Sequence, residues 1–157
     1  MKQTMLLAAL FAVAAITPAA ELPQFSQTNL IPAKELKIAA DNGVIAVTNL
    51  APARFCTAGF KADLAFQSGL ALRFEYRNVA VDGAALPDLV AVNFFLPDKR
   101  MTYTRFDASP EWKEAVVPLA SLKVVKSSQA LTPDDRFNRI SIYSRYNDNR
   151  EPAKTTL

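Results

Sequence analysis

Three segments of this 157-residue chain alternate apolar and polar side chains with a period of two. In residues 69–77, 89–96 and 139–146, the large side chains expected to face a core are Leu70, Leu72, Phe74, Tyr76, Val90, Val92, Phe94, Ile140 and Ile142. A strand places alternate side chains on opposite faces, whereas a helix repeats every 3.6 residues. Residues 101–106 follow a Pro-Asp-Lys-Arg turn and predict a further strand. The chain is therefore predicted to be all-β, an antiparallel β-sandwich.

Two further segments are read from local signals. Residues 36–40 and 44–48 flank Asp41-Asn42-Gly43, and Asn-Gly supplies the positive φ angles of a tight turn, which predicts a hairpin. Ser109 and Pro110 form a good helix start, so periodicity alone leaves residues 111–117 open between helix and strand.

The first twenty residues have the layout of a secretory signal peptide. Lys2 precedes an unbroken apolar run of twelve residues from Met5 to Ile16, followed by the small residues Thr17-Pro18-Ala19-Ala20. A run of twelve is too short to span a bilayer, which needs about twenty residues. We therefore expect cleavage after Ala20, one β-sandwich domain over residues 21–157, a secreted or periplasmic location, and no membrane contact after cleavage.

Composition excludes several classes of function. The chain has no His and a net charge of only +3, which argues against nucleic acid as a partner and removes the usual zinc ligand and the Ser-His-Asp triad. Cys56 is the lone cysteine and has apolar neighbours, so we expect a buried, inert thiol.

Three pieces of the sequence together resemble a galactose-binding-domain-like jelly roll. They are residues 70–77, the run Glu111-Trp112-Lys113 with Pro118-Leu119 after it, and residues 138–145. Non-catalytic carbohydrate-binding modules of bacterial glycoside hydrolases are the most similar group, and the resemblance covers roughly residues 44–157. It implies that residues 112–117 form a strand that ends at the proline.

The resemblance also implies one more strand than the sequence contains. Such domains commonly close with a strand that pairs near the N-terminal strands, and here the sequence stops at Thr155-Thr156-Leu157, where that strand would begin. We therefore expect a jelly roll without its last strand, truncated from a longer parent protein with other domains. That strand usually helps to hold a structural calcium, so we expect no cofactor and no metal site, with calcium left open.

The candidate ligand-binding residues are outward-facing positions on three predicted strands: Arg73, Glu75, Arg77, Asn93, Phe95, Tyr143 and Arg145. Planar aromatic rings stack on the apolar face of a sugar, while Asn, Arg and carboxylates bond its hydroxyl groups. The alternative is an ordinary solvated face with cross-strand Arg–Glu pairs.

Other polar or aromatic positions are expected to be structural. Trp112 is expected to pack in the core or at a sheet edge, and Asp134 and Asp135 to act in a turn or cap. The polar loop at residues 146–150 fits a binding rim and a solvated turn equally well.

The sequence thus predicts an exported, non-catalytic module that binds polysaccharide or glycan. It is not expected to be an enzyme, because glycoside hydrolysis needs two carboxylates across a cleft and Glu75 is the one acid on the candidate face. The alternative is a ligand-free structural module of an extracellular multidomain protein. An assembly factor similar to the complex-I intermediate-associated proteins shares this fold, but the signal peptide argues against it.

Overall fold

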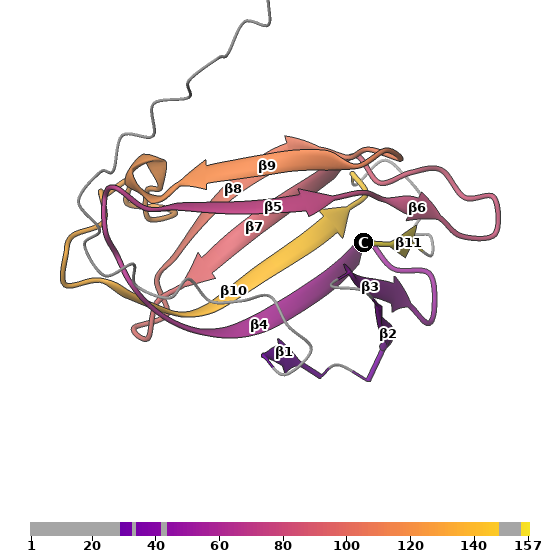
Figure 1. Cartoon of the computed structure of the whole chain (residues 1–157), viewed down its shortest axis with the longest axis horizontal. Helices are drawn as coiled ribbons and strands as arrows, with labels where there is room; N and C mark the ends of the chain where they lie inside the picture. Colours follow the sequence, from indigo (N-terminus) through magenta and orange to yellow (C-terminus); the bar gives the residue numbers. More distant parts are fainter. Residues whose placement is uncertain (1–28, 33, 42–43, 148–154) are drawn as a thin grey trace, which may run out of the picture.

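The computed structural model describes residues 29–32, 34–41, 44–147 and 155–157. They form two layers of antiparallel strands, as the sequence predicted (Figure 1). The one helical element among them is a short 3-10 turn, η1, at Leu119–Ser121. The predicted signal peptide and the residues from 148 to 154 lie outside the described part, so the predicted domain boundaries stay predictions.

The first layer is a five-stranded sheet in the order β1-β4-β10-β7-β8. Its strands are β1 (Leu30–Ile31), β4 (Phe55–Ala65), β10 (Arg136–Arg145), β7 (Leu89–Phe95) and β8 (Met101–Asp107). The strands predicted for this layer are confirmed as β7, β8 and β10. Alternation of large side chains identified β7 and β10 as half-buried strands, and the preceding turn identified β8.

The second layer consists of two separate sheets. One has the order β2-β3-β11-β6, made of β2 (Leu36–Asp41), β3 (Val44–Asn49), β11 (Thr155–Thr156) and β6 (Val79–Ala80). The other pairs β5 (Ala71–Tyr76) with β9 (Lys113–Pro118). The predicted hairpin is confirmed as β2 paired with β3, although its Asn42 and Gly43 lie outside the described residues.

The core lies between the layers, and the predicted inward positions of β7 and β10 are confirmed. Phe94 and Ile140 are fully buried, and the Phe94 ring contacts the Phe137 ring with centroids 5.2 Å apart. Leu72 and Val117 close the core from the second layer. Burying each such side chain contributes about 1.5 to 3 kcal/mol, which makes these faces the main source of stability.

Strand β4, which lies between β1 and β10, was not predicted. It alternates correctly, with Cys56, Ala58, Phe60 and Leu64 buried. However, Cys and Ala at the inward positions, with Gly59 outward, give a much weaker pattern than Val, Ile or Phe.

Cys56 is confirmed as a buried thiol. Its side chain is 0% exposed, and its Sγ donates a hydrogen bond to the carbonyl of Val47 at 3.1 Å. Burial raises the pKa of the Cys56 thiol to about 11. The group is therefore protonated at neutral pH and chemically quiet.

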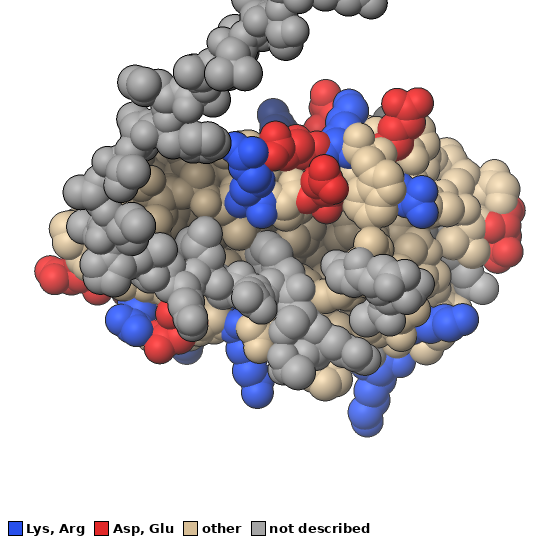
Figure 2. All heavy atoms as spheres, in the orientation of Figure 1, with Lys and Arg blue, Asp and Glu red and all other residues tan. Residues whose placement is uncertain are grey.

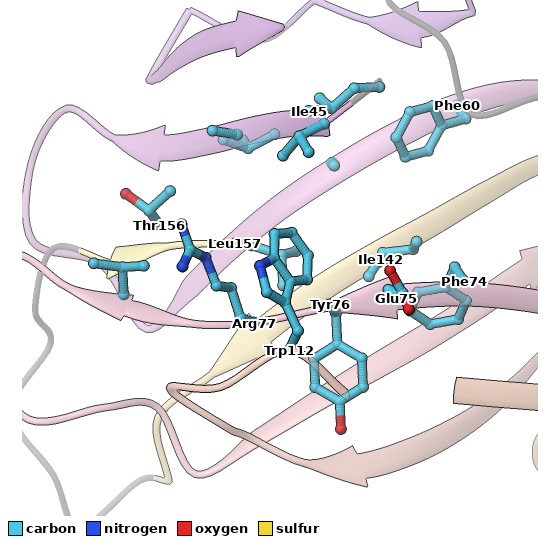
Figure 3. A pocket seen from close by; sticks show the side chains of 15 residues that line it. Ile45, Phe60, Phe74, Glu75, Tyr76, Arg77, Trp112, Ile142, Thr156 and Leu157 are labelled. Atoms are coloured by element: carbon cyan, nitrogen blue, oxygen red, sulfur yellow. The ribbon is translucent and has the colours of Figure 1, made fainter. Parts of the chain in front are cut away.

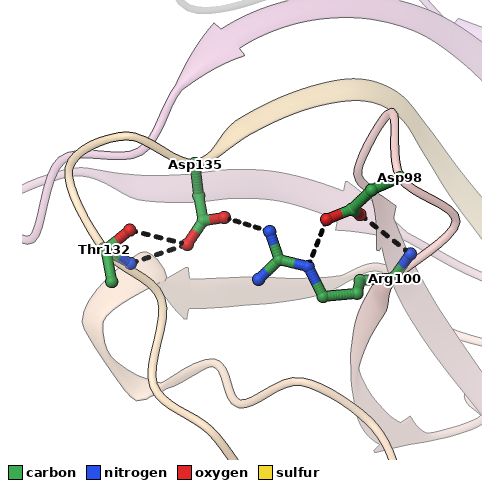
Figure 4. A network of polar contacts seen from close by, with 4 residues as sticks. All are labelled: Asp98, Arg100, Thr132 and Asp135. Carbon is green, nitrogen blue, oxygen red and sulfur yellow. Dashed lines mark hydrogen bonds and ion pairs between the residues drawn. The ribbon is translucent and has the colours of Figure 1, made fainter.

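Asp135 has the turn role expected of it (Figure 4). Its carboxylate accepts the Thr132 N–H at 2.7 Å and a guanidinium N–H of Arg100 at 2.6 Å, and Arg100 also bonds Asp98 in its own turn. Burial alone would raise the pKa of Asp135, but the hydrogen bonds from Thr132 and Arg100 outweigh it, so its pKa lies below the ordinary value. The network ties the β7–β8 turn to the loop before β10.

Trp112 does not lie in the core. The strand predicted for residues 112–117 is confirmed as β9, but it starts at Lys113, and Trp112 precedes it with 48% of its surface exposed. Since β9 pairs only with β5 among the described strands, Trp112 stands at the end of an edge strand, which is the sheet-edge alternative of the prediction and not the core one.

The closing strand begins where it was expected. Thr156 lies between Thr48 of β3 and Val79 of β6, and the next residue, Leu157, pairs with Val47. Figure 1 shows this end of the chain between β3 and the β5–β6 region. The predicted truncation stays a prediction.

Candidate functional site

The outer face of the five-stranded sheet presents an ordered grid of side chains. Strand pairing aligns outward positions of β4, β10, β7 and β8 in four rows: Phe55, Arg145, Leu89 and Asp107; Thr57, Tyr143, Ala91 and Arg105; Gly59, Ser141, Asn93 and Tyr103; Lys61, Arg139, Phe95 and Met101. Neighbouring strands lie about 4.8 Å apart, so residues within a row are close enough to act together. Four aromatic rings therefore share one face with four cations.

A groove of about 540 Å³ runs over this face. The sheet provides its floor, and the segment around β1 and the start of β2 provides one wall, through Ile31, Pro32, Glu35 and Leu36. Ile31 lies beside Gly59, where a Cβ would be in ordinary contact with the Ile31 side chain at 3.5 Å. From the sheet, the lining includes Phe55, Thr57, Asn93, Phe95, Arg139, Ser141 and Tyr143.

The rings in the groove contact each other or an arginine. The Phe55 and Tyr143 centroids lie 5.9 Å apart, and the Arg139 guanidinium lies 3.8 Å from the centroid of Phe95. Phe55 is 47% exposed, which is unusual for a phenylalanine and leaves a ring face open to a ligand. Burial raises the pKa of Tyr143, so its hydroxyl stays protonated and can donate a hydrogen bond.

Asn93 contributes an unmatched acceptor. Its Oδ1 is buried and has no hydrogen-bond partner among the described residues. A buried acceptor without a partner costs about 1 to 3 kcal/mol, so the amide gains by meeting a donor. Since Asn93 lines the groove, a hydroxyl group bound there can supply that donor.

The structure divides the seven predicted site residues between two faces. Asn93, Phe95, Tyr143 and Arg145 lie on the grid, and the first three line the groove. Arg73, Glu75 and Arg77 belong to β5 or follow it, on the opposite layer. The expectation that all seven converge was wrong, because alternation shows which residues face away from a core but not which sheet carries them.

The β5 residues instead fit the alternative interpretation of a solvated face. Arg73 forms a cross-strand ion pair with Glu114 of β9 at 2.8 Å, and both side chains are largely exposed. Figure 2 shows blue and red side chains interspersed along the edge where β5 and β9 lie. Such pairs are ordinary surface features.

A second cavity, of about 770 Å³, separates β3 and β11 from β5, and we call it the seam (Figure 3). Its walls are mostly core side chains, among them Val47, Phe60 and Ile142. Arg77 and Trp112 also line it, with the guanidinium 5.0 Å from the centroid of the indole ring. With few polar groups to bond hydroxyls, the seam suits an apolar occupant better than a sugar.

Sequence reasoning missed Phe55, Tyr103 and Arg139 as members of this face. Phe55 lies on the strand that was not predicted, and nothing in the sequence marks it as exposed. Arg139 lies on a predicted strand at an outward position, so alternation is the signal that could have found it. Tyr103 gives no such signal, because it alternates with Thr102, which is the buried residue.

Neither a metal centre nor a spanning helix occurs in the described part of the chain. Within residues 29–32, 34–41, 44–147 and 155–157, no three Asp, Glu or Cys side chains are grouped so that they could hold a metal ion. No helix in those ranges has the length and hydrophobicity needed to cross a membrane.

No protein-family model and no curated protein matches this chain. Among solved structures, it is similar to a family 11 carbohydrate-binding module from Clostridium thermocellum in complex with a β-1,3-1,4-mixed-linked tetrasaccharide. The TM-score is 0.51 at 13% identity, with 77% of each chain covered. The same family's module from the cellulosomal cellulase Lic26A-Cel5E of that organism gives 0.48 at 14% identity, covering 77% of this chain and 76% of that one.

An agarase, AgWH50C, is also similar, with a TM-score of 0.50 at 9% identity over 78% of this chain and 22% of the agarase chain. At such identities the likeness concerns the fold alone. It confirms the predicted antiparallel β-sandwich fold of the jelly-roll kind.

Proposed function

We propose that this chain is an exported, non-catalytic carbohydrate-binding module whose ligand site is the groove on the outer face of the five-stranded sheet. The observation that carries the proposal is the lining of that groove, where aromatic rings and hydrogen-bonding side chains share one open surface. A sugar ring has an apolar face and a polar rim, and this mixture complements both.

Each part of the lining has a role in this proposal. Phe55 and Tyr143 provide adjacent rings for stacking, and the Tyr143 hydroxyl, the Asn93 amide and the Arg139 guanidinium bond sugar hydroxyls. A module of similar fold was solved with a bound tetrasaccharide, which supports this use of the fold. Fold alone does not determine function, so the argument depends on the groove.

The proposal assigns no hydrolytic step to the protein. A glycosidase needs two carboxylates about 5 to 10 Å apart across the scissile bond. Of the described residues that line the groove, Glu35 is the only carboxylate. Export, to the periplasm or the medium, is supported by the predicted signal peptide, and it would bring the module to polymeric glycans outside the cell.

The test is retention of the chain from residue 21 on a panel of insoluble and soluble polysaccharides, with Tyr143→Ala as the groove variant. Trp112→Ala is the matched control, because Trp112 is also a partly exposed aromatic but lies on the seam. We expect Tyr143→Ala to weaken retention about fivefold or more, since removing an aromatic ring from a binding surface typically costs about 1 kcal/mol or more. Arg77→Ala should leave retention unchanged, because Arg77 also lies away from the groove.

Failure of the chain to bind any polysaccharide would favour the ligand-free structural module instead. Equal weakening by Tyr143→Ala and Trp112→Ala would remove the groove as the site. Thermal unfolding of each variant separates lost binding from lost fold.

A further inference from the structure

The grid on the outer face is unusually rich in cations. Arg145, Arg105, Lys61 and Arg139 occupy four of its sixteen positions, and Asp107 is its one carboxylate. Glu35, on the groove wall, adds a second negative charge nearby. A groove for neutral sugars needs acceptors as well as donors for hydroxyl groups, and this face is biased toward positive donors.

Three of these cations have no ion-pair partner among the residues that the structure describes. Arg105, Lys61 and Arg139 form no ion pair with any described residue, whereas arginines elsewhere do: Arg73 with Glu114, Arg136 with Asp63, and Arg100 with Asp98 and Asp135. These three cations on the outer face therefore keep their charge available to a ligand, unlike the paired Arg73, Arg100 and Arg136.

The Arg139 side chain is also held in place. Its guanidinium stacks on Phe95, 3.8 Å from the ring centroid, and both residues line the groove. A guanidinium on an aromatic ring keeps its N–H donors at the ring's periphery, where they can meet a carboxylate or sulfate with two parallel hydrogen bonds.

The cations are spread over the outer face instead of gathered at one point, with Arg139 in the groove lining and Arg145, Arg105 and Lys61 on the sheet beyond that lining. Arg139 and Arg145 lie six residues apart on β10, which corresponds to roughly 20 Å of extended strand. Arg105 stands in the same row as Tyr143, and this row lies between the rows of Arg139 and Arg145. A single small anion cannot reach all of them, but a polymer with a charge on successive sugar units can.

We infer that the ligand of this groove is an acidic polysaccharide, whose carboxylate or sulfate groups are bound by Arg139, Arg105 and Lys61 while its sugar rings stack on the aromatic side chains. This inference rests on the proposed function and narrows its ligand class.

The test compares polymers that differ only in charge. Polygalacturonate is paired with its carboxyl-reduced galactan, and dextran sulfate with dextran, in affinity electrophoresis and titration calorimetry. We expect at least tenfold tighter binding to one acidic polymer than to its neutral partner. The preference should shrink as NaCl rises from about 0.02 to 0.5 M, because salt screens exposed charges.

Variants assign the preference to the groove. Arg139→Gln and Arg105→Gln should each reduce the acidic-to-neutral affinity ratio several-fold. Arg73→Gln is the matched control, since Arg73 is an exposed arginine paired on the other layer, and it should leave the ratio unchanged. Arg139→Lys should retain part of the preference, because it keeps the charge but loses the planar donor fork.

The outcomes distinguish the proposed carbohydrate-binding function from the inference that the ligand is acidic. Binding to neutral and acidic polymers with equal affinity, or binding only to neutral polysaccharides of the wider panel, would overturn this inference and keep the proposed function. Binding to no polysaccharide of either set would end both. A preference that Arg73→Gln weakens as strongly as Arg139→Gln would show unspecific attraction to positive charge and would also overturn it. Carboxylate and sulfate as the recognised group are told apart by which pair of polymers shows the preference.

Discussion

Leu157 and Val47 exchange two backbone hydrogen bonds, each of 3.0 Å. Residues that pair in this way across antiparallel strands point to the same face, and Val47 is buried at 1% exposure. Leu157 therefore points inward, and both residues line the seam. Residues placed after Leu157 in the same extended conformation would pass along β3 and fill the space between β3 and β5.

The first prediction concerns such an extension. Five residues added after Leu157, with Val at the second and fourth positions and Thr elsewhere, place their Val side chains in the seam, because every second residue shares the face of Leu157. We expect the melting temperature to rise by several degrees, since apolar burial and new backbone hydrogen bonds both favour the folded state. Differential scanning calorimetry measures the shift.

A register-shifted extension is its control. It has the same composition, but its two Val residues stand at the first and third positions and Thr elsewhere, so that the apolar side chains face solvent. The idea of a strand-accepting seam fails if both extensions change the melting temperature equally or not at all.

Phe94 and Phe74 should differ in their contribution to stability. Phe94 is fully buried against Phe137, so Phe94→Ala leaves a closed cavity and should cost about 3 to 5 kcal/mol in the free energy of unfolding. Phe74 is only partly buried and already borders the seam, so Phe74→Ala should cost about 1 to 3 kcal/mol. Urea denaturation measures both values, and equal losses would mean that the seam is filled in solution.

Asp135 should make stability depend on acid pH. Its pKa is lowered in the folded state, so its contribution is fully present above the ordinary pKa near 3.8 and is lost as the pH falls through the folded value. Asp135→Asn should destabilise by about 1 to 2 kcal/mol at pH 7, a figure kept low because the Arg100 side chain is 36% exposed. The difference between the two proteins should shrink as the pH falls below the ordinary pKa of an aspartate, and a difference that does not change with pH would assign it to packing.

Cys56 should react only when the protein unfolds. With a pKa of about 11, roughly one thiol in a thousand is ionised at pH 8, and the sulfur has no exposed surface. An aromatic disulfide reagent should therefore label the native protein no faster than global unfolding permits, and label the urea-unfolded chain at once. Rapid labelling under native conditions would show local opening beside Val47, and Cys56→Ala provides the blank.

The strands with large alternating side chains were predictable because alternation reports burial on one side. Residues 89–96 and 139–146 became β7 and β10 almost without change. In β4 the inward residues include Cys56 and Ala58, which bury little surface and so leave little trace in the sequence. For residues 111–117, local signals conflicted, and only the resemblance to a jelly roll identified a strand.

For the candidate site, alternation predicted which residues face outward but not which sheet carries them. Asn93 and Tyr143 lie on neighbouring strands, and their outward positions followed from alternation. Arg73 satisfied the same rule, yet its strand pairs with β9 in the other layer. Pairing between distant strands depends on the whole chain, so a local pattern cannot tell one outer face from the other.

The seam also affects the volume of the folded protein. A space of about 770 Å³ bordered by Phe60, Ile142 and other core side chains enlarges the folded molecule wherever water does not occupy it. Unfolding eliminates such space, and the accompanying decrease in volume is what hydrostatic pressure favours. Rising hydrostatic pressure should therefore lower the free energy of unfolding of the sandwich.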